Sequence, residues 1–233
     1  MQDTPYFFEE NISLSNEMIQ LNEENSHHIQ QVLRLKSGSE IVITNGKGVL
    51  LHGAITWMDK KKTIFHTHTK DQTIPPINKI SICSCVLKNI HRFEWFLEKA
   101  VEIGVSEIIP VISKRTEKKN VRHDRMKQIM KSALMQSKQS WLPVLQEPLS
   151  FEKAILLEGF DYKYIAHCEE AEKSNLHADH SSGHIQMLIG PEGDFTPEEI
   201  EMALTRGFTP VSLGRNRLRS ETAALVALAL LNN

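Results

Sequence analysis

The sequence predicts an α/β protein in which a domain with a mostly parallel sheet follows a small domain of short strands. From Ile77 onward, apolar strand patterns alternate with amphipathic helical patterns, which is typical of a parallel sheet. Residues 1–72 instead show several short alternating strands and one helix, which favours a small barrel-like domain. Between these regions, residues 71–76 contain Pro75-Pro76, which cannot continue a strand and which stiffens a linker. We therefore expect one domain over residues 1–72 and a second over residues 77–233.

In the first domain, Asn45-Gly46 separates the apolar runs 40–44 and 49–56, a pattern that predicts a β-hairpin. A further alternating run follows at residues 63–69. The spacing of Ile29, Val32 and Leu33 predicts a helix over residues 26–35.

In the second domain, start and stop signals delimit the elements. Gly104 ends a helix that begins near His91. Thr196 followed by Pro197 and two glutamates opens another helix. Ser220 is expected to cap the last helix. The predicted strands cover residues 79–87, 107–111, 162–167, 185–189 and 210–213, and the other helices cover 124–138, 150–157 and 220–230.

Composition describes an ordinary globular protein: 40% of the residues are hydrophobic, 24% are charged and the net charge is −2. Any surface that binds a polyanion must then be a local patch. Cys83 and Cys85 fit two buried small residues on one strand face better than metal ligands, and we expect no metal site. The N-terminus lacks the features of a signal peptide, and the apolar run 223–231 is about half a membrane span. We expect a cytoplasmic protein without a membrane segment.

Two segments have the form of ligand-binding loops. The first, residues 188–196, is Leu-Ile-Gly-Pro-Glu-Gly-Asp-Phe-Thr and joins a strand to a helix. In open α/β sheets, ligands bind at that edge, and the glycines allow the backbone to approach a ligand closely. The segment matches neither a Walker loop nor a dinucleotide fingerprint. A plain turn is the competing interpretation.

The second segment, residues 211–224, also leaves a strand through a glycine and enters a helix. Three arginines crowd this loop next to a helix N-terminus, which favours an anion or a nucleotide. A capped helix with solvated arginines is the alternative. If the two loops belong to one sheet, they line a single pocket for a nucleotide-like ligand.

Together, Leu-Ile-Gly-Pro-Glu-Gly and Leu-Gly-x-x-x-Leu-Arg-Ser-Glu-Thr-Ala resemble the signature loops of the SPOUT methyltransferases, specifically the RsmE family of 16S rRNA uridine-N3 methyltransferases. Residues 27–34 and 98–105 are similar to two further segments of that family, so the resemblance spans nearly the whole chain. This chain departs from it at Gly193-Asp194, where many relatives have Gly-Gly, and at Arg215-Asn216, where many have Pro-Arg.

The resemblance implies a PUA-like β-barrel domain over residues 1–72 and a SPOUT α/β domain with a trefoil knot over 77–233. It also implies a homodimer whose active sites are completed across the interface, with 16S rRNA of the small ribosomal subunit as substrate. S-adenosyl-L-methionine would lie in the knot, held largely by backbone groups. Carried over position by position, the cofactor-binding residues are Ile189, Gly190, Pro191, Glu192, Gly193, Leu213, Gly214, Leu218 and Arg219.

Residues 113–140 are the basic part of the chain, and a phosphate-binding stripe there fits the family's need for an RNA-binding surface. A solvated helix and loop is the alternative. The candidate RNA-binding residues are Arg34, Lys114, Arg115, Lys118, Lys119, Arg122 and Arg215.

For catalysis, uracil N3 must lose its proton before it attacks the methyl group, and Arg219 is the candidate cation for the resulting anion. Glu221 would orient Arg219 or accept the proton; the alternative is that it serves only the helix N-terminus.

Two other functions remain open. One is a different SPOUT reaction such as ribose 2′-O-methylation, whose enzymes typically carry an asparagine-containing element where this chain has Ser220-Glu221-Thr222. The other is a non-catalytic RNA-binding ribosome-assembly factor.

Overall fold

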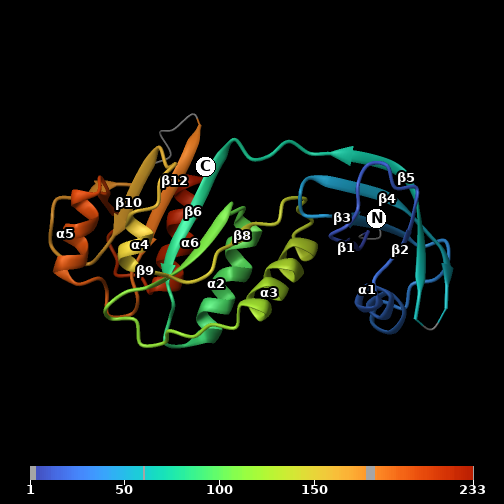
Figure 1. Cartoon of the computed structure of the whole chain (residues 1–233), viewed down its shortest axis with the longest axis horizontal. Helices are drawn as coiled ribbons and strands as arrows, with labels where there is room; N and C mark the ends of the chain where they lie inside the picture. The colour runs from blue at the N-terminus through green and yellow to red at the C-terminus, as the bar shows by residue number, and fades with distance from the viewer. Residues whose placement is uncertain (1–3, 60, 177–181, 233) are drawn as a thin grey trace. The chain divides into compact units, whose positions relative to one another are not determined.

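The computed structural model describes residues 4–59, 61–176 and 182–232, and the chain divides into two compact units (Figure 1). The N-terminal unit comprises Met1–Pro75 together with Lys131–Leu142, and the C-terminal unit comprises Pro76–Met130 with Pro143–Asn233. The linker at Pro75-Pro76 coincides with the first division, whereas the return of residues 131–142 to the N-terminal unit has no sequence signal.

The N-terminal unit contains a five-stranded sheet in the order β1-β3-β4-β5-β2. Its strands are β1 (Tyr6–Phe8), β2 (Met18–Gln20), β3 (Glu40–Thr44), β4 (Val49–Met58) and β5 (Thr63–Gln72). β1 pairs with β3 in parallel, and the other pairs are antiparallel. A buried apolar core that includes Ile29, Leu51 and Phe65 fills the unit. The small β-rich domain predicted from the sequence is therefore confirmed.

The predicted hairpin is present between β3 and β4. The Asn45 side-chain oxygen accepts hydrogen bonds from the backbone N–H groups of Lys47 and Val49, at 2.8 and 3.2 Å. Gly46 and Gly48 have positive φ angles of 67° and 88°, which explains why the turn uses glycines. The predicted helix is displaced: α1 (Glu23–His27) begins three residues earlier because Asn22 caps it, and it continues as a π-helical turn over His28–Val32.

Residues 131–142 close the N-terminal unit through specific contacts. The backbone N–H of Leu142 donates to the carbonyl of Gly46 at 2.8 Å, and the N–H of Gly48 donates to the carbonyl of Ser140 at 2.8 Å. The ammonium group of Lys131 lies 4.6 Å from the ring centroid of Phe8. This segment therefore belongs structurally to a domain whose first part ends at Pro75, 56 positions before Lys131.

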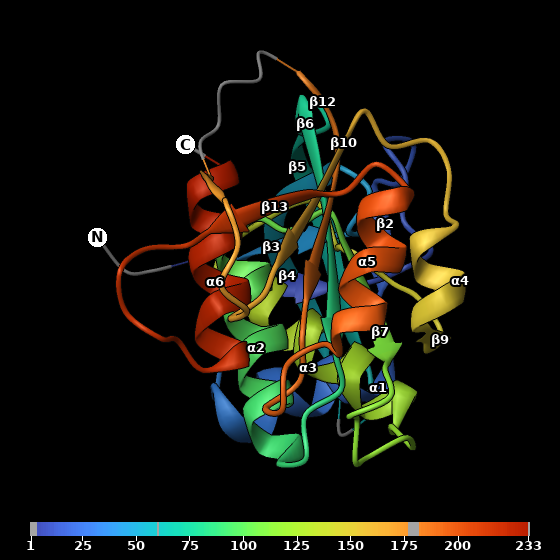
Figure 2. The same ribbon diagram turned by 90° about the vertical axis from the view of Figure 1, so that its left-hand side faces the viewer.

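The C-terminal unit is built on a parallel sheet in the order β11-β13-β10-β12-β6-β7-β8, and β9 also pairs with β7. The strands are β6 (Asn78–Cys85), β7 (Glu107–Ile112), β8 (Val144–Leu145), β9 (Leu149–Ser150), β10 (Tyr162–Ala166), β11 (Ser174–Asn175), β12 (Gly183–Ile189) and β13 (Thr209–Ser212). The helices are α2 (Ile90–Ile103), α4 (Phe151–Ile155), α5 (Pro197–Thr205) and α6 (Ser220–Leu231). A further helix, α3 (His123–Gln136), begins in this unit and passes into the N-terminal unit at Lys131. Figure 2 shows α2 and α6 on one face of the sheet and α4 and α5 on the other. The predicted parallel α/β fold is confirmed.

In the C-terminal unit, two helix ends follow the sequence signals and one does not. Gly104 ends α2 at φ 98°, and Thr196 forms a capping box with Glu199 at the start of α5. The prediction that Ser220 caps the last helix is wrong. Arg219 is the cap residue, because its backbone is still extended at ψ 154°, whereas Ser220 is already helical. No side-chain hydrogen bond caps α6.

Cys83 and Cys85 are fully buried on β6, as the strand pattern predicted. Burial raises the pKa of each thiol to about 12. Within the described ranges, no helix is long and apolar enough to cross a membrane, and no group of three or more metal-ligating side chains comes together.

Candidate functional site

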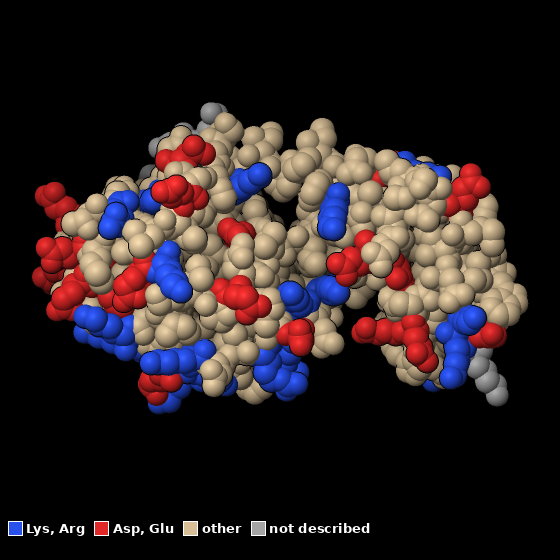
Figure 3. All heavy atoms as spheres, viewed as in Figure 1, with Lys and Arg blue, Asp and Glu red and all other residues tan. Residues whose placement is uncertain are grey.

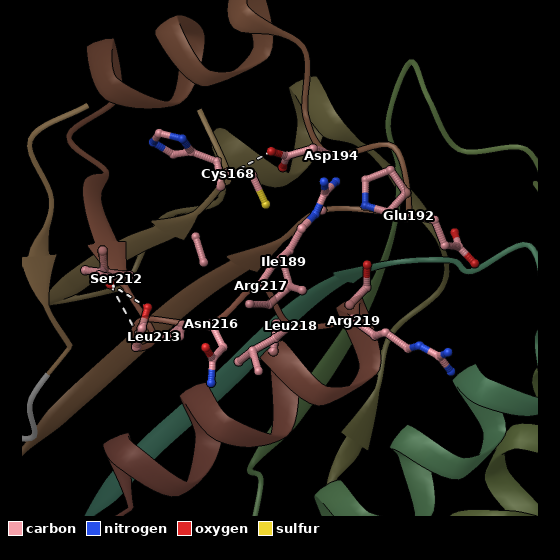
Figure 4. A pocket seen from close by; sticks show the side chains of 18 of the residues that line it. Cys168, Ile189, Glu192, Asp194, Ser212, Leu213, Asn216, Arg217, Leu218 and Arg219 are labelled. Atoms are coloured by element: carbon pink, nitrogen blue, oxygen red, sulfur yellow. Dashed lines mark hydrogen bonds between the residues drawn. The ribbon is translucent and has the colours of Figure 1, made fainter. Parts of the chain in front are cut away.

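Three loops meet at one edge of the C-terminal sheet. The strands β13, β10 and β12 are adjacent and parallel, so their carboxyl ends lie at the same edge. The loops that follow them, residues 167–173, 190–196 and 213–219, contribute walls to a pocket of about 640 Å³ (Figure 4). This volume is in the range of small-molecule and cofactor sites, which are roughly 300–1,000 Å³.

The two loops singled out from the sequence both line this pocket. Of the predicted cofactor-binding residues, all but Gly193 line it. They are Ile189, Gly190, Pro191, Glu192, Leu213, Gly214, Leu218 and Arg219. Gly193 contacts Arg115 instead: its carbonyl accepts a hydrogen bond from Nη1 of Arg115 at 2.7 Å. The structure thus brings together two loops that are separated in the sequence by α5 and β13.

Gly214 gives the third loop its open conformation. Its φ angle is 129°, in the region that disfavours L side chains, and a Cβ atom there would meet no heavy atom within 4 Å. The backbone therefore borders open space in the pocket. The neighbouring Arg215, Asn216 and Arg217 also line the pocket and are exposed.

The loop over residues 167–173 was missed by the sequence analysis. Lys173 closes it, because its ammonium group donates to the carbonyls of His167 and Glu169 at 2.8 and 2.6 Å. Burial, with a smaller contribution from Lys173, lowers the pKa of the His167 imidazole. Both ring nitrogens of His167 are buried without a hydrogen-bond partner among the described residues. The residues of this loop carry no signal of their role, because the sequence does not indicate that β10 lies between β12 and β13.

The two candidate catalytic residues lie at the start of α6 in different environments. Arg219 is exposed and lines the pocket, and Figure 4 shows its side chain extending toward α2. Glu221 is only 6% exposed, and its Oε1 lies 3.7 Å from Nε of Arg92 on α2. Its other oxygen, Oε2, has no hydrogen-bond partner among the described residues. Glu221 is therefore paired with Arg92, a pocket residue that the sequence analysis did not identify.

The basic stripe divides into paired and unpaired cations. Arg125 forms a double hydrogen bond with Glu94, Lys114 lies 3.6 Å from Glu198, and Arg115 donates to backbone carbonyls. In contrast, Lys119 and Arg122 are exposed and have no ion-pair partner among the described residues. On the face drawn in Figure 3, Lys and Arg side chains gather along the lower edge of the C-terminal unit.

The remaining RNA-binding candidates are scattered. Lys118 is half-buried in the same segment as Lys119, and Arg215 is exposed at the pocket. Arg34 belongs to the N-terminal unit and has a positive φ angle of 53°.

The fold and the pocket define an α/β protein with a pocket at the carboxyl ends of parallel strands. The comparisons with known proteins give the family. Residues 74–232 match the RNA methyltransferase domain family, and residues 21–65 match the PUA domain of RNA methyltransferases. The ribosomal RNA small subunit methyltransferase E of Synechocystis sp. is 30% identical over 222 residues, which cover 88% of this chain and 70% of that protein. The chain therefore belongs to the RsmE family of RNA methyltransferases.

Solved structures agree with this assignment. A probable rRNA methyltransferase from Porphyromonas gingivalis is 34% identical with a TM-score of 0.85, covering 96% of this chain and 95% of that chain. The ribosomal RNA small subunit methyltransferase E from Neisseria gonorrhoeae, solved with S-adenosyl methionine bound, is 29% identical with a TM-score of 0.85. That alignment covers 97% of this chain and 96% of the gonococcal protein. The SPOUT fold class and the PUA-like N-terminal domain expected from the resemblance are confirmed.

Proposed function

We propose that this protein transfers the methyl group of S-adenosyl-L-methionine to N3 of a uridine in 16S rRNA of the small ribosomal subunit. The observation that carries the proposal is the pocket of about 640 Å³ lined by both family signature loops. The cofactor supplies a methyl group on a sulfonium, so the protein contributes positioning and electrostatics. The open space beside Gly214 suits close approach of a ligand to the backbone.

Arg219 is proposed to stabilise the uridine anion that forms when N3 loses its proton. It lines the pocket and has no ion-pair partner among the described residues, so its charge is available to a substrate. Glu221 is proposed to act as a proton acceptor or as a positioning residue, and its pairing with Arg92 favours the second role. In either role its burial makes loss of Arg92 costly, because an unpaired buried carboxylate remains.

Single-turnover methylation with saturating RNA and cofactor tests the role of Arg219. Arg219→Ala should slow the step by roughly 10- to 1,000-fold, since an interaction made mainly in the transition state is removed. Arg206→Ala, at an exposed arginine that ends α5 outside the pocket, is the matched control and should leave the rate unchanged. A wild-type rate for Arg219→Ala would remove Arg219 from the mechanism.

Nucleoside analysis of the product identifies the reaction. N3-methyluridine supports the proposal, whereas a 2′-O-methylated nucleoside would assign the protein to the other SPOUT chemistry. Absence of S-adenosyl-L-methionine binding in calorimetry would instead favour a non-catalytic RNA-binding role in ribosome assembly.

RNA is proposed to bind through the exposed cations of the stripe, chiefly Lys119 and Arg122, with contributions from Lys114, Arg115, Lys118, Arg34 and Arg215. Phosphate contacts release counterions, so loss of each contact should reduce the salt dependence of binding by up to roughly one unit of slope. The double variant Lys119→Ala/Arg122→Ala should bind RNA more weakly with a flatter slope. The control Lys153→Ala/Arg206→Ala removes the same charge outside the stripe and should match wild type. An unchanged slope in the first variant would show that the stripe is a solvated face.

A homodimer is also proposed, in the cytoplasm where rRNA is modified. α6 buries Ala224, Ala227 and Leu228 against its own unit, yet Leu225 and Leu230 on its other side are apolar and only half-buried. An amphipathic helix needs one apolar stripe, so the second apolar side supports a partner. Sedimentation at micromolar concentration should give a dimer, and Leu225→Glu should give a monomer; a wild-type monomer with full activity would refute the proposal.

A further inference from the structure

The loop between β12 and α5 contains a turn that an ordinary residue avoids. Asp194 has a φ angle of 64°, in the left-handed region, and it is one of three non-glycine residues with positive φ in the described part of the chain. Residues other than glycine rarely adopt this conformation, although aspartate and asparagine tolerate it best. Such a turn persists only where surrounding contacts hold it.

The Asp194 carboxylate ties two walls of the pocket together. Its Oδ1 accepts a hydrogen bond from the backbone N–H of Phe195 at 2.8 Å. Its Oδ2 accepts one from the backbone N–H of Cys168 at 2.7 Å, which Figure 4 shows as a bridge between the two loops. Cys168 follows β10 and Asp194 follows β12, so a single side chain connects the loops after two neighbouring strands.

The side chain of Arg115 also binds this turn. Nη1 of Arg115 donates to the carbonyls of Gly193 and Phe195, at 2.7 and 3.2 Å, which flank Asp194 on both sides. Oδ1 of Asp194 would lie 3.1 Å from a Cβ atom at Gly190, so the absence of a side chain there lets the carboxylate approach. The turn is therefore held by contacts on both sides.

We propose that Asp194 is a positioning residue that fixes the loop over residues 167–173 against the loop over residues 190–196 and thereby sets the width of the cofactor pocket. The proposal rests on the proposed binding of S-adenosyl-L-methionine in this pocket. Asp194 acts through the backbone, because both of its carboxylate oxygens already accept N–H groups. Its contribution is to affinity for the cofactor and not to the methyl-transfer step.

Two substitutions separate this role from a general effect on folding. Asp194→Gly keeps the left-handed backbone accessible and removes both hydrogen bonds. Asp194→Asn keeps the backbone preference and the side-chain shape, but its amide oxygen replaces only one of the two acceptors. Asp161→Gly is the matched control, because Oδ2 of Asp161 also accepts a backbone hydrogen bond, from His184 at 2.8 Å, at the opposite ends of β10 and β12 and outside the pocket.

Three measurements on the full-length protein test the proposal. The dissociation constant for S-adenosyl-L-methionine should rise about tenfold in Asp194→Gly and about threefold in Asp194→Asn, and it should be unchanged in Asp161→Gly. The KM for the cofactor should rise in parallel while kcat at saturating cofactor stays at the wild-type value. Hydrogen exchange at the Cys168 amide, measured without cofactor, should accelerate in Asp194→Gly.

Several results would overturn the proposal. Wild-type affinity in Asp194→Gly would show that the contact has no effect on the pocket, and a lower kcat with unchanged KM would place Asp194 in the chemical step. Equal losses in both variants with unchanged Cys168 exchange would indicate direct attraction between the Asp194 charge and the cationic cofactor. If the wild-type protein binds no S-adenosyl-L-methionine, the proposed function and this proposal are refuted together. If the wild-type protein binds the cofactor but exchange at the Cys168 amide is unaltered in Asp194→Gly, only the positioning role is refuted.

Discussion

Replacement of Gly214 by alanine tests the pocket most directly, because the structure predicts separate effects on folding and on binding. The new Cβ meets no protein atom within 4 Å, so the stability loss comes only from backbone strain at φ 129°. Such strain costs about 1–3 kcal/mol. Because Gly214 lines the pocket, we expect the same carbon to take up space proposed for the cofactor. An extra methyl group in a close-packed contact costs about 1–3 kcal/mol, which corresponds to a dissociation constant roughly 5- to 150-fold higher.

Gly207→Ala provides the matched control. Gly207 also has a positive φ angle, 82°, and a Cβ atom there also meets nothing within 4 Å, but it does not line the pocket. Urea unfolding should show that both variants are destabilised, whereas calorimetry should show that only Gly214→Ala binds S-adenosyl-L-methionine more weakly. If Gly214→Ala binds the cofactor as tightly as Gly207→Ala does, the loop over residues 213–219 does not contact the cofactor.

Two further predictions concern single side chains. Cys168 is exposed at the pocket, whereas Cys83 and Cys85 are fully buried with pKa values raised to about 12, so a thiol reagent should label one cysteine in the folded protein and three in denaturant. S-adenosyl-L-methionine should slow that labelling; rapid labelling of a second thiol would contradict the burial of β6. Hydrogen bonds from Arg125 lower the pKa of the Glu94 carboxyl, so this pair stabilises the fold above the ordinary glutamate pKa of 4.5 and the stabilisation disappears as pH falls through the lowered value. Arg125→Met should therefore lower the free energy of unfolding near pH 7 and leave it unchanged in strong acid. An equal loss at both pH values in urea unfolding would refute the ion-pair explanation.

Much of the site was predictable because its signals are local. A strand that ends in a glycine and leads into a helix is visible within ten residues, and both such loops, at Gly190 and Gly214, line the pocket. The order of strands in a sheet is a non-local property. For that reason the loop at His167 escaped notice, although it lines the same pocket as these two.

The sequence located the basic segments but did not reveal which groups each arginine contacts in the fold. Arg115 belongs to the basic stripe by sequence, yet its guanidinium donates a hydrogen bond to the carbonyl of Gly193, which lies 78 residues later in the sequence. Arg92 similarly reaches Glu221 from another helix. The strands β1 and β2 were missed for a simpler reason: each has three residues, too few for an alternating pattern to be recognised.

The place of residues 131–142 in the N-terminal unit has a consequence for the order in which the protein folds during synthesis. Residues 1–75 leave the ribosome well before Ser140 and Leu142, which supply backbone hydrogen bonds to the β3–β4 hairpin. Domains generally fold as units during translation, beginning at the N-terminus. Here the first domain cannot complete its hydrogen bonds until more than half of the chain, including β6, α2 and β7 of the second domain, has emerged. A fragment cut at Pro75 would lack this closing segment, so grafting of the N-terminal domain onto another enzyme requires residues 131–142 to be transferred with it.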